Sequence, residues 1–94
     1  MTATLRRYWF RFKGDPRDLP PGGYWGYGVT AWTEEDALFL IRTRLFDDKE
    51  LPPILEMTAD IDIRDIEANH VRPNIGTPSW RGIWYPLGFA EPSE

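Results

Sequence analysis

The strongest constraint on the fold of this chain is an alternation of side chains near its N-terminus. Residues 4–13 place aromatic rings on one side of an extended chain and mostly basic groups on the other: Tyr8, Phe10 and Phe12 against Arg7, Trp9, Arg11 and Lys13. A period of two with aromatic residues is typical of a half-buried strand. We therefore expect a strand here, with its Tyr8 side facing the core.

A second alternation covers residues 54–63. Apolar side chains share one side and mostly acidic groups the other: Leu55, Met57, Ala59, Ile61 and Ile63 against Glu56, Thr58, Asp60 and Asp62. The pattern predicts another half-buried strand. If it lies beside the first strand, its acidic row faces the basic row, and each opposite-charge pair adds roughly 0.2–1 kcal/mol.

The segment between the two alternations predicts one helix. Thr33 is a candidate N-cap with Asp36 three residues later, and Arg42 and Arg44 suit the C-terminal end. Apolar residues recur at helical spacing on one face: Ala37, Leu38, Ile41 and Leu45. Two rings, Phe39 and Phe46, fall nearly opposite that face, so the helix is either covered on two sides or exposes these rings.

The rest of the chain is irregular. Residues 14–28 form a loop rich in glycine and proline, and we expect short strands at 27–31 and around 82–85, with one helical turn at 64–69. The prolines in 69–88 exclude a regular helix there. The prediction is one domain over residues 1–94 of the α+β class. It has a small, mostly antiparallel sheet in β-β-α-β order, one helix packed on one face, and an irregular aromatic-rich C-terminal segment.

Charge and composition narrow the functional classes. The 94 residues carry 15 acidic and 11 basic side chains, a net charge of −4, and no cysteine. This balance disfavours nucleic acid as a partner and excludes thiolate chemistry. The N-terminus lacks the apolar run of a signal peptide, and no stretch approaches the roughly 20 apolar residues of a membrane span. We therefore expect a cytoplasmic protein without a membrane role.

Candidate chemical sites are weakly supported. Asp60, Asp62, Asp65, Glu67 and His70 include oxygen and imidazole ligands, but the alternation and the missing motif spacings argue against a metal. The glycines of 22–28 lack the lysine and the following helix of a phosphate loop. We expect no metal, no cofactor and no catalytic residue.

Two alternatives to a protein-binding role stay open. One is a small-ligand or enzyme site around His70, Arg72 and Asn74, although a lone histidine more often holds a turn. The other is single-stranded nucleic-acid binding, in which bases stack on an exposed ring between basic groups: Arg7, Trp9 and Arg11.

The leading interpretation is a small non-enzymatic protein-binding domain. Trp, Tyr and Arg dominate interface hot spots, and five tryptophans exceed what one small core needs. The acidic balance suits a basic partner, so an immunity-like or inhibitor-like role is the most concrete version. A homo-oligomer stays open. The predicted contact residues are Trp25, Glu56, Asp60, Asp62, His70, Arg72, Trp80, Arg81 and Trp84.

Three segments also resemble a group of small uncharacterised bacterial proteins. They are Gly-Val-Thr-Ala-Trp-Thr-Glu-Glu-Asp-Ala-Leu at 28–38, Asn-His-Val-Arg-Pro-Asn at 69–74 and Trp-Arg-Gly-Ile-Trp-Tyr-Pro-Leu-Gly at 80–88. That group has no assigned activity. The resemblance therefore implies a bacterial, cytoplasmic setting and assigns no role to any residue.

Overall fold

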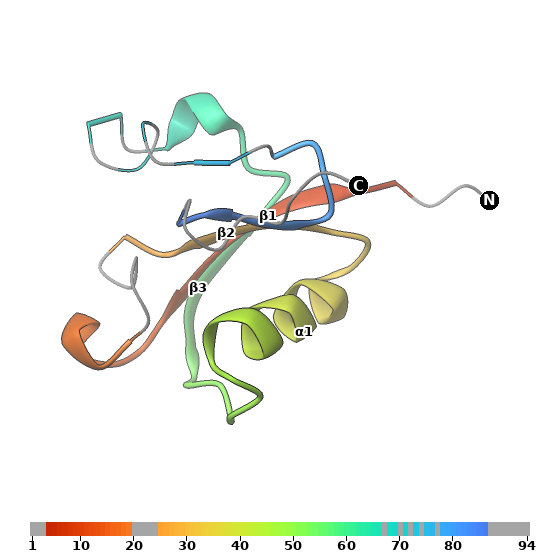
Figure 1. Ribbon diagram of the computed structural model, residues 1–94. Helices are drawn as coiled ribbons and strands as arrows, with labels where there is room; N and C mark the ends of the chain where they lie inside the picture. Colours follow the sequence, from red (N-terminus) through yellow and green to blue (C-terminus); the bar gives the residue numbers. More distant parts are fainter. Residues whose placement is uncertain are drawn as a thin grey trace.

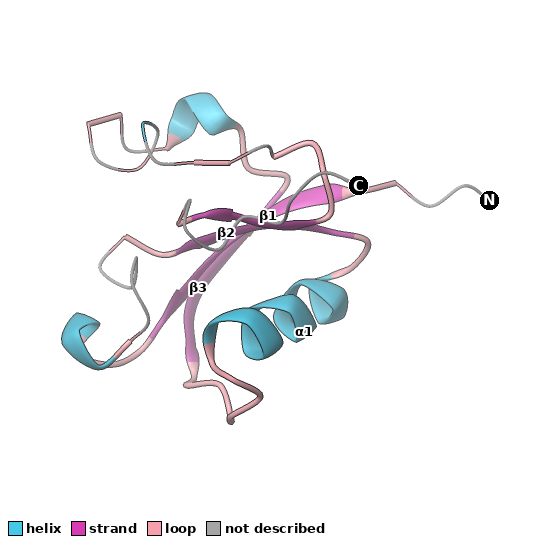
Figure 2. Ribbon diagram, in the orientation of Figure 1, coloured by secondary structure: helices cyan, strands magenta, loops and turns pink. Residues whose placement is uncertain are grey.

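The computed structural model describes residues 4–19, 25–66, 68–69, 71, 73, 75–76 and 78–86. In chain order the elements are β1 (Arg6–Phe12), the 3-10 turn η1 (Pro16–Asp18), β2 (Tyr27–Ala31), α1 (Glu34–Leu45), β3 (Ile54–Ala59), the 3-10 turn η2 (Ile63–Asp65) and β4 (Gly82–Tyr85). The strands form one antiparallel sheet in the order β3-β1-β2-β4. Helix α1 covers one face, and the chain that follows β3 crosses the other (Figure 1). Figure 2 shows the same division between helix and strands. The predicted α+β class is confirmed.

The first core lies between α1 and the sheet. The alternation in β1 turns Tyr8, Phe10 and Phe12 toward the helix, where all three are buried. They pack with the buried residues of β2, α1 and β4: Tyr27, Val29, Ala31, Ala37, Leu40, Ile41, Leu45 and Ile83. The predicted core side of the first strand is therefore correct.

Helix α1 begins where the sequence places its cap. The backbone N–H of Asp36 donates to Thr33 Oγ1 at 3.0 Å, and the N–H of Trp32 donates to Asp36 Oδ2 at 3.1 Å. The buried face differs by one residue from the prediction, because Leu40 is buried and Leu38 lies at its edge. The aromatic rings of β1 and β2 pack against the helix in this core. Phe39 is exposed, whereas Phe46 packs edge-on against Phe12 with ring centroids 5.8 Å apart.

A second core lies on the other face of the sheet. It consists of Trp9, Ile66, Val71, Trp84 and Tyr85. The Trp9 ring centroid lies 5.7 Å from that of Trp84 and 5.5 Å from that of Tyr85. Trp84 is only 1% exposed, whereas Trp80, four residues earlier, is 46% exposed. The two tryptophans of the C-terminal segment thus have opposite environments.

Strand β3 corrects the prediction for residues 54–63. The strand is shorter, because Asp60 adopts φ 56° and ends it, and Ile61 and Ile63 then pack against the second core. Nor is the strand half-buried, since Leu55 is 52% exposed and Met57 37%. An edge position in the sheet explains this exposure, because β1 is the one described strand that lies beside β3. The register against β1 slips at Leu55, which makes a β-bulge.

Candidate functional site

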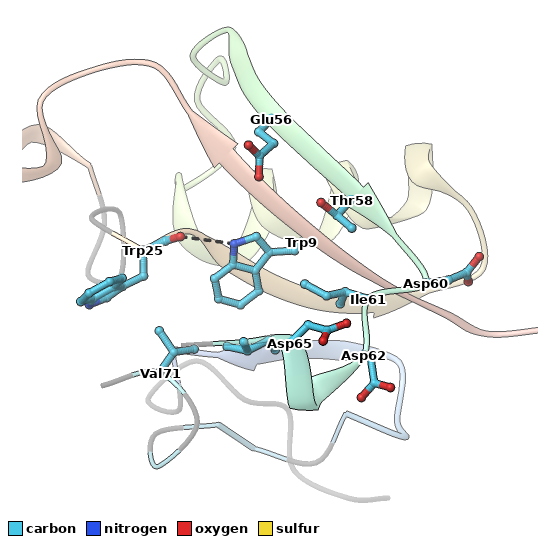
Figure 3. A pocket seen from close by; sticks show the side chains of 10 residues that line it. Trp9, Trp25, Glu56, Thr58, Asp60, Ile61, Asp62, Asp65 and Val71 are labelled. Atoms are coloured by element: carbon cyan, nitrogen blue, oxygen red, sulfur yellow. Dashed lines mark hydrogen bonds between the residues drawn. The ribbon is translucent and has the colours of Figure 1, made fainter. Parts of the chain in front are cut away.

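A hollow lies over the face of the sheet opposite α1. It encloses about 440 Å³. Strand β1, the approach to β2, strand β3 and the chain that follows it line the hollow: Trp9, Trp25, Glu56, Thr58, Asp60, Ile61, Asp62, Asp65, Ile66 and Val71. We call this the tryptophan–acid pocket. Figure 3 shows Trp9 at its centre and Trp25 toward one end.

A hydrogen bond connects Trp9 and Trp25, which both line the pocket. Trp9 Nε1 donates to the backbone oxygen of Trp25 at 3.2 Å, and the bond is drawn in Figure 3. Gly26 makes this approach possible. A Cβ at that position would lie 2.5 Å from Trp9 Nε1 and 2.8 Å from the Phe10 carbonyl oxygen. Gly26 therefore makes room for an indole ring.

Among the described residues, all the charged side chains that line the pocket are acidic. Glu56 reaches toward it from β3, whereas the carboxylate of Asp60 points away from it (Figure 3). Asp60 accepts a hydrogen bond from Arg6 Nε at 2.9 Å, and Asp62 accepts one from Arg64 NH2 at 2.8 Å. Within the described part of the chain, no salt bridge involves Glu56 or Asp65.

These arginines keep two of the carboxylates ionised. Side-chain hydrogen bonds from Arg64, followed by its backbone N–H, lower the pKa of Asp62 to about 2. The side-chain hydrogen bonds of Arg6 lower the pKa of Asp60 below its ordinary value of 3.8. A carboxylate with a lowered pKa is a poor proton donor or acceptor near neutral pH. Because Asp60 and Asp62 are already paired with arginines, Glu56 and Asp65 are the described lining carboxylates left to receive a cation.

Four of the predicted contact residues meet at this pocket: Trp25, Glu56, Asp60 and Asp62. Three others lie elsewhere. Trp84 is buried in the second core, Trp80 is exposed outside the pocket lining, and Arg81 forms a salt bridge with Asp36 at the start of α1. His70 and Arg72, with Asn74 of the alternative small-ligand site, lie outside the described residues.

The nucleic-acid alternative needed an exposed ring on β1. Trp9 is only 7% exposed and stacks on Tyr85 rather than facing solvent. Arg7 is also engaged, because its Nε donates to the Ile61 carbonyl oxygen at 3.0 Å. The ring that this alternative requires for base stacking is therefore packed in the second core.

Arginines engage two of the acidic residues considered as metal ligands, Asp60 and Asp62. In the described ranges, no group of three or more acidic, histidine or cysteine side chains is placed to hold an ion. Asp60 and Asp62 bond to different arginines, and Glu67 and His70 fall outside those ranges.

Several lining residues were absent from the predicted contact set: Trp9, Thr58, Ile61, Asp65, Ile66 and Val71. Thr58 lies on the same side of the alternation as Glu56, so the sequence alone could have placed it beside Glu56. The others come together only because the chain reverses after Asp60 and returns over the sheet. Nothing in local sequence spacing indicates that reversal.

No family model, curated protein or solved structure matches this chain. Among the described residues, no helix combines the length and apolar character needed to cross a membrane.

Proposed function

We propose that this chain is a small non-enzymatic protein-binding domain that receives a basic partner at the tryptophan–acid pocket. An immunity-like or inhibitor-like role in a bacterial cytoplasm is its most concrete form. The supporting observation is the pocket lining, in which the described charged residues are acidic and the walls include two indoles.

The chemistry favours an arginine or lysine side chain as the group that enters. Cations are attracted to the faces of tryptophan rings, and a guanidinium also donates charge-assisted hydrogen bonds to carboxylates. Glu56 lines the pocket and forms no salt bridge with any described residue, so its carboxylate is available to a cation. The net charge of −4 would also accelerate the approach of a basic protein.

The proposal is tested with a short arginine-rich peptide as the probe. We expect titration to shift the indole N–H resonances of Trp9 and Trp25. Because an exposed ion pair contributes up to about 1 kcal/mol, Glu56→Gln is expected to weaken binding about fivefold.

Glu35→Gln is the matched control, since it removes the same charge from the exposed surface of α1. This change should alter affinity less than about twofold, because only long-range attraction is reduced. Equal losses in the two variants would show that binding follows net charge alone. Absence of any indole shift would refute the proposal.

A further inference from the structure

Strand β3 has one edge that pairs with no described strand. It stands at the end of the sheet, where only β1 is beside it. In an antiparallel strand, alternate residues direct both backbone polar groups toward the same side. The groups of β3 that do not face β1 therefore point outward, where they can pair with another strand.

The surface beside this edge carries exposed apolar side chains and little charge. Ile54, Leu55 and Met57 are all exposed, and Glu56 is the only charged residue of β3. The bulge at Leu55 protects only the start of the strand. From Glu56 to Ala59 the register against β1 is regular, which leaves a straight segment for pairing.

The two faces of this segment differ in chemistry. Glu56 and Thr58 line the tryptophan–acid pocket. Met57 and Ala59 lie opposite Phe10 and Tyr8 of β1, and so share the face that carries α1. A strand added beside β3 would present alternate side chains to an acidic face and to an apolar face.

We propose that an extended, basic segment of the partner protein adds as a strand to the free edge of β3. Its basic side chains enter the tryptophan–acid pocket, and the intervening apolar side chains pack beside Met57. This inference rests on the proposed function and specifies the partner: an arginine- or lysine-containing segment in which basic and apolar residues alternate. Backbone hydrogen bonds supply affinity, while the two faces supply specificity.

Charge argues for a basic segment rather than a second copy of this chain. Two-fold pairing of β3 with itself would keep the faces aligned and place two acidic pockets on the same side of a continuous sheet. Each copy also carries a net charge of −4, so the two copies repel each other. A basic strand has the complementary charge.

The experiment measures amide hydrogen exchange of the whole chain with an eight-residue peptide of alternating valine and arginine. We expect the outward-pointing amides within residues 56–59 to exchange rapidly without peptide and slowly with it. A peptide of four valines followed by four arginines keeps the charge but loses the alternation. It should bind about tenfold more weakly, equivalent to about 1.4 kcal/mol.

A pair of variants tests the edge by a second route. Met57→Lys places a positive charge on the exposed edge, which natural proteins use to prevent strand pairing. Phe39→Lys adds the same charge to the exposed surface of α1. Only Met57→Lys is expected to abolish the new protection in β3.

The outcomes separate this inference from the proposed function. Indole shifts without new protection in β3 would overturn strand addition and leave the pocket proposal standing. Failure of both peptides to bind would refute both. A peptide-free dimer in sedimentation, with β3 amides already protected, would assign the edge to a second copy and also overturn the inference.

Discussion

At the scale of single residues, two glycines determine where the tryptophan rings of the second core lie. A Cβ at Gly26 would lie 2.5 Å from Trp9 Nε1, and one at Gly28 would lie 2.5 Å from the Trp84 ring. Both glycines face rings that come from other strands. The missing side chain therefore allows close packing between elements, and this role is separate from forming a turn.

This packing role predicts a specific loss of stability. Gly26→Ala should lower the free energy of unfolding through two effects, because Gly26 has φ 127° and its Cβ would meet Trp9. Gly14→Ala is the matched control, since Gly14 has φ 132° but its Cβ would meet nothing closer than Leu19 Cδ2 at 3.9 Å. We expect Gly26→Ala to cost about 1–3 kcal/mol more than the control, the usual range for overpacking. Urea unfolding of both variants measures the difference, and equal losses would show that backbone strain alone matters.

At the scale of elements, α1 was the most predictable part and β3 the least. The cap at Thr33 is local, because a side chain and a backbone N–H three residues away complete it. The burial of a strand depends instead on its neighbours. The alternation in 54–63 resembles that of β1, yet β1 is central and β3 is at an edge.

The N-cap at Thr33 makes a measurable contribution to stability. Thr33→Ala removes the acceptor for the Asp36 N–H and should destabilise the protein by about 1 kcal/mol. Thr43→Ala is the internal comparison, because among the described residues Thr43 Oγ1 bonds only to the Phe39 and Leu40 carbonyl oxygens of the same helix. Alanine is the better helix former, so this change should be neutral or slightly stabilising. Thermal unfolding of both variants distinguishes the loss of the cap hydrogen bond from the effect of replacing a threonine elsewhere in the helix.

At the scale of the whole molecule, salt bridges join distant parts of the chain. Arg81, next to β4, bonds through its Nε to Asp36 Oδ2 of α1 at 2.9 Å, and Arg6 of β1 bonds to Asp60 beyond β3. Hydrogen bonds from Arg81 lower the pKa of Asp36 below its ordinary value of 3.8. These contacts link the pH dependence of stability to tertiary structure.

The direction of that dependence follows from the lowered pKa values. A carboxyl group whose pKa is lower in the folded state stabilises the fold above its unfolded pKa and loses that contribution as the pH falls. We expect the free energy of unfolding to decrease as the pH falls from about 4 toward the Asp62 pKa of about 2. Asp36→Asn should reduce stability at pH 7 by about 1 kcal/mol and make this decrease smaller. Urea unfolding across pH tests this, with Glu50→Gln as the control for an exposed carboxylate. An unchanged pH slope in Asp36→Asn would contradict the assignment.

The α+β class, the inward face of β1, the helix cap and three of the four acidic residues of the described pocket lining follow from the sequence alone. These features depend on period, spacing and local hydrogen bonds, which act between residues close together in the chain. The shared burial of Trp9 and Trp84 and the exposure of Trp80 depend instead on tertiary contacts. The same is true of the edge position of β3. Both follow from the order of strands and from the reversal after Asp60, which depend on contacts between residues far apart in the sequence.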